Sequence, residues 1–287
     1  MKHETLFYKV YNTRNSMRSL SSVTYISLIS ISICLFVGFF VLITHSTGEI
    51  KSTAAKLRGH SLLYQMASTT TPAVTIRRVA KIPPMLYGTA WKKDRTKELV
   101  ELAIRTGFRG IDTACQPKHY YEPGVGEALT ALINENVITR SDLFLQTKFT
   151  GIRGQDPSNV PYDPSDPIRE QVWTSFSTSL MNLNTDYIDS LVMHSPCEKL
   201  SDTLIVWNTF EEIYDTGRVL NLGLSNTYDI NTLRTVYGSA RIKPKFLQNR
   251  FYKESGYDKE IREFCKQNGI LYQTFWTLTA NPHITKR

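Results

Sequence analysis

Five side chains could together deliver a proton to an oxygen atom. Asp112, Lys148 and His194 each follow a short apolar run, and the pair Tyr120 and Tyr121 comes shortly after the aspartate. A phenol ordinarily loses its proton near about pH 10, but a lysine ammonium in contact would lower that pKa. The aspartate would keep the lysine charged and oriented, and His194 could hydrogen-bond the same oxygen. These donors suit a carbonyl group that accepts a hydride, because negative charge then develops on its oxygen.

Each of these residues also has a simpler structural explanation. Asp112 could cap the following helix, Lys148 could end a strand in solvent, and His194 could be a hydrogen-bonded core histidine. Taken one at a time, these explanations are the expected ones. Three successive strands that end in Asp, Lys and His are unusual by chance, so the set as a whole favours a joint site.

The chain around these residues alternates between strand-like and helix-like segments. Short apolar, β-branched or aromatic runs are expected to be strands, and segments of helical periodicity are expected to be the helices between them. The seven expected strands cover residues 84–89, 110–114, 143–149, 188–193, 219–226, 244–250 and 270–276, and the six expected helices cover 94–105, 125–134, 168–183, 200–214, 230–237 and 257–268. Such alternation predicts an α/β protein with a parallel sheet, either open or closed into a barrel.

The ends of the expected strands decide between these two architectures. In a barrel all carboxyl ends meet at one mouth, whereas an open sheet gathers its site at one switch point. Residues 124–129, GVGEAL, also have leucine where a dinucleotide fingerprint needs its third glycine. We therefore expect a (β/α)8 TIM barrel, incomplete with about seven strands. Six consecutive strands finish in a polar residue, namely Thr89, Asp112, Lys148, His194, Asn226 and Gln248.

The N-terminal part differs in composition from the rest. Residues 23–43 form a run of 21 residues without a charge, which is long enough to cross a bilayer as a helix. No clear small-residue cleavage site follows this run, so we interpret it as one transmembrane anchor rather than a signal peptide. Residues 1–22 are then a basic tail, residues 44–84 a polar linker, and residues 85–287 the barrel domain.

Charge and cysteine content limit the partners and the location. The net charge is +8, but residues 1–65 hold seven Lys and Arg against two Asp and Glu, so most of the excess flanks the anchor. No nucleic acid partner is expected, because no basic stripe with interleaved aromatic residues follows. Four cysteines without CxxC spacing predict no metal site. The unpaired cysteines and the absence of an Asn-x-Ser/Thr sequon favour a single-pass membrane protein whose barrel domain lies in the cytosol. If translation started at Met66 instead, the protein would be soluble and cytosolic.

Several ordered segments resemble the aldo-keto reductases. These are GFRGIDTA followed by VGEAL, then LFLQTKF, YIDSLVMHSP, LGLSN and FLQNRFY, and the resemblance covers roughly residues 84–282. It implies an NADPH-dependent reduction of an aldehyde or ketone to an alcohol. It also implies that Asp112, Lys148, His194 and a tyrosine form the catalytic group.

The same resemblance implies the cofactor and substrate contacts. A small-molecule carbonyl substrate and a monomeric catalytic domain are expected. The residues implied for NADPH are Gly88, Thr89, Ala90, Asp112, Ser225, Asn226, Gln248, Phe275 and Trp276, and His194 is implied for the substrate. Trp91 and Tyr121 are expected to form apolar walls of the substrate site.

The tyrosine departs from the commoner pattern of the family. In that pattern a glutamate lies shortly before the VG pair, and the tyrosine lies three residues before the glutamate. In this chain the glutamate is Glu122, and the residue three positions before it is His119. The segment CQPKHYYEPGVG instead resembles a fungal-type branch with a longer turn, which points to Tyr120 as the proton donor. Tyr121 remains the alternative.

The C-terminal end is a second departure. The family continues into an eighth strand and helix that carry basic residues for the adenosine 2′-phosphate, whereas this sequence ends at NPHITKR. In (β/α)8 barrels the phosphate site is frequently formed by the loops after strands seven and eight. Two alternatives to an active reductase therefore stay open. One is a catalytically weak or inactive reductase-like binding module, and the other is an incomplete gene product that lacks the C-terminal cofactor phosphate site.

Overall fold

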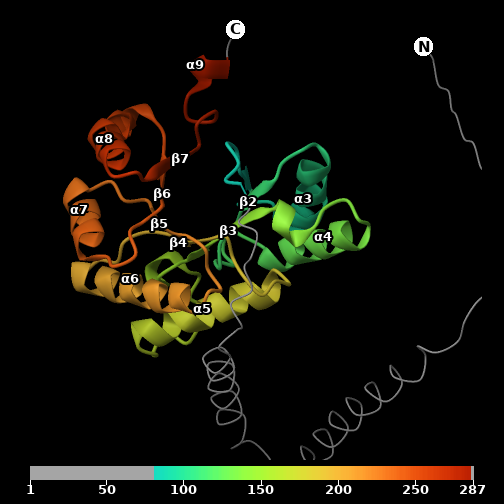
Figure 1. Ribbon diagram of the computed structural model, residues 1–287, viewed down its shortest axis with the longest axis horizontal. Coiled ribbons are helices and arrows are strands. Elements are labelled where there is room, and N and C mark those ends of the chain that lie inside the picture. Colours follow the sequence, from blue (N-terminus) through green and yellow to red (C-terminus); the bar gives the residue numbers. More distant parts are fainter. Residues whose placement is uncertain (1–80, 286–287) are drawn as a thin grey trace, which may run out of the picture. The chain divides into compact units, whose positions relative to one another are not determined.

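Residues 81–285 are described by the computed structural model, and they form an α/β domain built on one parallel sheet (Figure 1). The strand order follows the sequence from β1 to β7, so the seven predicted parallel strands are confirmed. Within the described residues β1 and β7 each have one strand neighbour, and the sheet is an open arc there. The strands are β1 (Tyr87–Gly88), β2 (Gly110–Asp112), β3 (Phe144–Phe149), β4 (Ser190–Met193), β5 (Leu222–Ser225), β6 (Phe246–Arg250) and β7 (Leu271–Phe275).

One helix follows each strand, and all of these helices except the last cover the outer face of the arc (Figure 1). The helices predicted to begin at residues 94 and 257 become α-helical two residues later, because a 310 turn precedes each. At the second of these, Tyr257 and Asp258 have positive φ angles, which interrupt the α-helical path. The helices are α3 (Thr96–Arg105), α4 (Glu122–Asn134), α5 (Ile168–Asn182), α6 (Leu200–Asp215), α7 (Ile230–Ser239), α8 (Lys259–Gln267) and α9 (Pro282–Thr285), with η1 (Lys93–Arg95) and η4 (Lys253–Asp258) as the 310 turns.

The two faces of the sheet differ in chemistry because successive side chains of a strand alternate between them. Leu145 and Leu247 face outward and belong to the large apolar core under the helices. Phe144 and Phe246 face inward and pack edge to face at 5.5 Å, forming an apolar layer near the amino ends of the strands. Above this layer the inward positions become polar. Register pairs Gln248 with the glutamine at 273 and pairs Arg250 with Phe275.

The polar inward layers lead to the carboxyl ends of the strands. Every residue of β3 is buried, including Lys148. A buried lysine needs an anion or several acceptors nearby, so this strand alone places an ionic site at the mouth of the arc.

Helices α4 and α5 come into close contact at Gly126. A Cβ atom at this glycine would lie 2.1 Å from the carbonyl oxygen of Asn182 and 3.0 Å from backbone atoms of Leu183. Gly126→Ala should therefore lower the free energy of unfolding by about 3 kcal/mol, because backbone must move to make room. Urea denaturation followed by circular dichroism measures this loss.

Gly238→Ala provides the matched control for Gly126→Ala. Gly238 also lies in a helix, α7, but a Cβ atom there would meet nothing within 4 Å. The alanine should leave stability unchanged or raise it by about 0.5–1 kcal/mol through higher helix propensity. Equal losses for the two variants would contradict a specific contact between α4 and α5.

The segments before the sheet fall mostly outside the described part of the chain. The predicted basic tail (1–22), the anchor (23–43) and the linker up to residue 80 all lie there and stay predictions. Among residues 81–285 no helix has the length and apolar character needed to cross a membrane. Residues 81–84 of the predicted linker are described, and Ile82 packs against Phe144 and Phe246.

Candidate active site

Asp112 and Lys148 form an ion pair at the carboxyl ends of β2 and β3. Lys148 Nζ donates to Asp112 Oδ1 at 2.7 Å and to the carbonyl oxygen of Thr113 at 2.9 Å. The lysine side chain is 1% exposed and the aspartate side chain is 13% exposed. Burial acts to lower the pKa of Lys148, but the charges of Asp112 and Tyr120 outweigh it and leave this pKa raised. Lys148 is therefore an ammonium at neutral pH.

Tyr120 lies beside this ion pair and beside His194. Lys148 Nζ is 5.3 Å from the centroid of the Tyr120 ring, and the Tyr120 and His194 rings meet edge to face at 5.9 Å. Lys148 acts to lower the pKa of the phenol, as expected, but the net pKa of Tyr120 is raised. Burial raises the pKa of Tyr120, and the attraction of Lys148 offsets this only in part. The phenol thus keeps its proton at neutral pH until a stronger base forms next to it.

His194 follows β4, and its ring has one hydrogen-bond partner in the described part of the chain. Its Nδ1 lies 2.6 Å from Thr150 Oγ1. When the threonine hydroxyl donates in this contact, the ring proton is on Nε2 and can be given in a hydrogen bond. Burial, with added repulsion from Lys148 and His119, lowers the pKa of His194 to about 3. The ring is therefore neutral at physiological pH.

This histidine should make the fold sensitive to acid. The pKa of His194 in the folded chain is about 3, below the ordinary value of about 6.5. Between these two pH values His194 is therefore protonated in the unfolded chain and neutral in the folded chain. The stability contribution is present above about pH 6.5 and is lost as the pH falls towards 3. His194→Gln should flatten the decline in the free energy of unfolding between these values, measured by urea denaturation at each pH. His283→Gln, at an exposed histidine, is the control, and equal slopes for wild type and His194→Gln would contradict the assignment.

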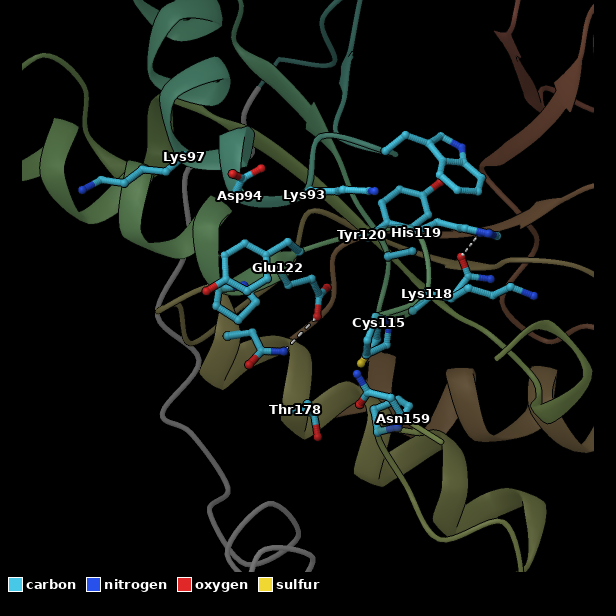
Figure 2. A pocket seen from close by; sticks show the side chains of 18 of the residues that line it. Lys93, Asp94, Lys97, Cys115, Lys118, His119, Tyr120, Glu122, Asn159 and Thr178 are labelled. Carbon is cyan, nitrogen blue, oxygen red and sulfur yellow. Dashed lines mark hydrogen bonds between the residues drawn. The ribbon is translucent and has the colours of Figure 1, made fainter. Parts of the chain in front are cut away.

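Tyr120 borders two cavities. One is a cleft of about 1440 Å³ that runs along the inner face of the arc, from Phe246 and Leu271 near the amino ends of the strands to Asp112 and His194 at the carboxyl ends. The other is a cavity of about 750 Å³ beside η1, α4 and α5, and Figure 2 shows Tyr120 and His119 at its edge. Tyr121, the alternative proton donor and predicted substrate wall, lines only the second cavity and is 43% exposed. This placement separates Tyr121 from the Asp112–Lys148 pair and favours Tyr120.

Most of the residues predicted for the cofactor and substrate line the larger cleft. Thr89 differs from the prediction, because it is fully buried and its Oγ1 donates to the carbonyl oxygen of Asp112. It supports the pairing of β1 with β2. Both tryptophans of the cleft are more than half exposed. The predicted residues that line the cleft are Gly88, Ala90, Trp91, Asp112, Tyr120, His194, Ser225, Asn226, Gln248, Phe275 and Trp276.

A chain of glutamine side chains that the sequence reasoning missed crosses the interior of the arc. Gln146 donates to Asp112 Oδ1 at 2.8 Å and to Gln273 Oε1 at 3.0 Å. Gln248 donates to the same Gln273 oxygen at 3.1 Å. The alternation of inward positions in β3, β6 and β7 is the signal that could have found it. These bonds connect the predicted nicotinamide contact Gln248 to the Asp112–Lys148 pair.

The described residues include few groups that suggest metal or disulfide chemistry. Cys115, Cys197 and Cys265 are free thiols. Between residues 81 and 285 no group of three or more His, Cys, Asp or Glu side chains could hold a metal ion.

Residues 85–287 match the model of the Aldo/keto reductase family. The chain belongs to this family. Among curated relatives, it is 33% identical over 172 residues to an uncharacterized oxidoreductase, YtbE, of Bacillus subtilis, and 31% identical over 174 residues to the glyoxal reductase of the same organism. Each match covers 60% of this chain and 54% of the relative. The chain thus spans about half the length of these two relatives.

Solved structures of aldo/keto reductases have the same fold. A reductase from a Medee basin deep-sea metagenome matches with a TM-score of 0.57 and 26% identity, covering 70% of this chain and 66% of that one. A reductase of Brucella melitensis matches with a TM-score of 0.56 and 28% identity, covering 69% of this chain and 70% of that one. The Bombyx mori enzyme in complex with NADP has a TM-score of 0.56 at 23% identity, covers 68% and 62%, and supports the fold alone.

Proposed function

We propose that the barrel domain reduces an aldehyde or ketone to an alcohol with NADPH. The observation that carries this proposal is the buried ion pair of Asp112 and Lys148 next to Tyr120 and a neutral His194. Asp112, Tyr120 and His194 line the same cleft. NADPH, when bound, supplies the hydride that the carbonyl carbon accepts. The protein side chains orient the carbonyl oxygen and supply the proton.

The proton is proposed to come from Tyr120. The carbonyl oxygen would accept hydrogen bonds from Tyr120 Oη and from His194 Nε2, which orient it and favour negative charge on it. As that charge develops, the phenol gives up its proton, and the ammonium of Lys148 stabilises the phenolate that remains. Asp112 holds Lys148 in place at 2.7 Å.

The cleft offers groups that fit the nicotinamide end of the cofactor. In the described part of the chain no donor reaches Gln248 Oε1, so it can accept from a carboxamide N–H. Asn226 lies nearby, with its side chain bonded to the carbonyl oxygen of His194. Phe275 and Trp276 supply aromatic faces on the neighbouring strand end. We propose these residues, with Ser225, as the nicotinamide site.

Named relatives support a small carbonyl substrate and this cofactor. One is the glyoxal reductase mentioned above, and another is an NAD(P)H-dependent D-xylose reductase of Pachysolen tannophilus, 27% identical and covering 71% of this chain and 67% of the relative. We propose that the segment CQPKHYYEPGVG places the chain in a fungal-type branch with Tyr120 as donor. We also propose a monomeric catalytic domain.

Cofactor binding and turnover test the proposal directly. The full chain is titrated with NADPH while tryptophan fluorescence is recorded, and then mixed with NADPH and benzaldehyde while the cofactor absorbance is followed. Saturable binding and consumption of NADPH with formation of benzyl alcohol are expected. A folded chain that binds no NADPH would overturn the proposal and leave the reductase-like binding module as the explanation.

The N-terminal segment is proposed to anchor the enzyme to a membrane with its catalytic domain in the cytosol. The basis is the uncharged run at 23–43, which is followed by a polar linker. The full chain should stay in the membrane fraction after alkaline extraction, and a chain that starts at Met66 should not. Release of the full chain by the extraction would contradict the anchor.

A further inference from the structure

Arg250 is a cation in the cleft that the proposed reaction does not use. It ends β6, and the alternation of the strand places its side chain on the same inward face as Gln248. Register sets it opposite Phe275, and it lines the cleft. Its guanidinium carbon lies 4.0 Å from the centroid of the Trp276 ring and 5.3 Å from that of Tyr252. The guanidinium is therefore stacked on an aromatic wall at the mouth.

The donors of this arginine lack an acceptor in the described part of the chain. Arg250 forms no ion pair there, and its Nε is buried without a hydrogen-bond partner. A buried donor without a partner is costly, so such a group suggests a missing acceptor. Stacking on Trp276 fixes the plane of the guanidinium and leaves its N–H fork available in that plane. Such a fork matches the two oxygens of a carboxylate or a phosphate.

The strand end that carries Arg250 is itself held in place. The backbone N–H of Arg250 donates to Tyr228 Oη at 3.1 Å, and that hydroxyl donates to Asn226 Oδ1 at 3.2 Å. Asn226 is part of the proposed nicotinamide site. The backbone of Arg250 is therefore connected by hydrogen bonds through Tyr228 to the proposed cofactor site.

The charge balance of the cleft favours an anion. Asp112 is the one carboxylate among its lining residues in the described chain, and it is already paired with Lys148. Lys92 lines the cleft as well and has no ion-pair partner among the described residues. Two unpaired cations and no unpaired carboxylate give the mouth a positive potential, which concentrates anions there.

We propose that Arg250 binds an oxyanion, a phosphate or a carboxylate, at the mouth of the cleft. The proposal rests on the proposed reductase function in one respect, which is the source of the anion. That source is either the pyrophosphate of the cofactor or an acidic group on the carbonyl substrate. In both cases Arg250 contributes a bidentate contact that positions its ligand without taking part in proton transfer.

A binding experiment without turnover tests the site itself. The full chain is titrated with sodium pyrophosphate at constant ionic strength in a calorimeter. The Kd is expected to rise by about tenfold or more in Arg250→Gln, because a charge-assisted bidentate contact is lost. Arg250→Lys keeps the charge without the fork and should fall between the two. Arg262→Gln is the matched control, since Arg262 lies over the Phe251 ring at 5.5 Å, bonds to the carbonyl oxygen of Tyr257 and does not line the cleft.

Two further measurements distinguish the source of the anion. If the cofactor carries it, Arg250→Gln raises the Kd for NADPH about tenfold and leaves the Kd for nicotinamide riboside unchanged. If the substrate carries it, the variant lowers kcat/KM for 4-carboxybenzaldehyde about tenfold relative to benzaldehyde and leaves the NADPH Kd unchanged. Either pattern supports the proposal.

Failure of this proposal and failure of the reductase function give different results. Equal pyrophosphate Kd values for wild type, Arg250→Gln and Arg250→Lys, each with a wild-type circular dichroism spectrum, would overturn the anion site even in an active reductase. Binding of pyrophosphate that depends on Arg250, in a chain that reduces no aldehyde, would support the anion site and count against the reductase function.

Discussion

Tyr120→Phe should lower kcat for carbonyl reduction by about 10³-fold while the Kd for NADPH changes little. The phenol lies beside Lys148, with Nζ 5.3 Å from the ring centroid, and its raised pKa keeps it protonated at neutral pH. The phenylalanine ring preserves the packing against His194 but removes the proton. Single-turnover kinetics with saturating NADPH, together with a cofactor titration, measure the two effects separately.

Tyr121→Phe is the matched control for this variant. The two tyrosines are adjacent, but Tyr121 is absent from the lining of the cleft that holds Asp112 and His194. Its hydroxyl should therefore be dispensable, and kcat should stay within about twofold of wild type. The opposite pattern, with full activity in Tyr120→Phe and none in Tyr121→Phe, would show that Tyr121 is the donor and that the assignment is wrong.

The order of the strands could be predicted because buried parallel strands leave a direct record in the sequence. Segments such as residues 143–149 and 188–193 are short apolar runs, and the structure buries every residue of the strands that they contain, β3 and β4. The helix starts were harder to predict. The turn before α8 depends on the positive φ angles of Tyr257 and Asp258, and tyrosine is an uncommon residue in that conformation.

The position of the site could be predicted, but its electrostatics could not. Asp112, Lys148 and His194 stand at strand ends, and the parallel sheet brings such ends together. The direction of the Tyr120 pKa shift depends on how deeply the ring is buried, which local sequence does not record. Arg250 was missed for a related reason. Its significance depends on Trp276, which lies 26 residues later and meets it through the register of β6 and β7.

The Asp112–Lys148 pair gives a second large expected effect, this time on stability. Asp112→Asn should lower the free energy of unfolding by about 3 kcal/mol, because it leaves the ammonium of Lys148 buried at 1% exposure without its anion. The asparagine oxygen can still accept from Gln146, so the effect reports the lost charge. The double variant Asp112→Asn with Lys148→Met should recover most of this stability, since neither charge is then buried. Urea denaturation of the two variants and of the wild type measures both changes.

An exposed ion pair of almost the same length isolates the role of burial. Arg153 and Glu198 lie 2.8 Å apart with side chains 75% and 74% exposed, whereas the buried pair is 2.7 Å apart. Glu198→Gln should change stability little, because solvent screens the pair and hydrates the arginine that remains. Both Asp112→Asn and the double variant should lose carbonyl reduction, so recovered stability without recovered activity would separate the structural from the chemical role of Lys148. If the double variant is as unstable as Asp112→Asn, the loss of stability comes from disturbed packing around residue 148 and not from an unpaired charge on Lys148.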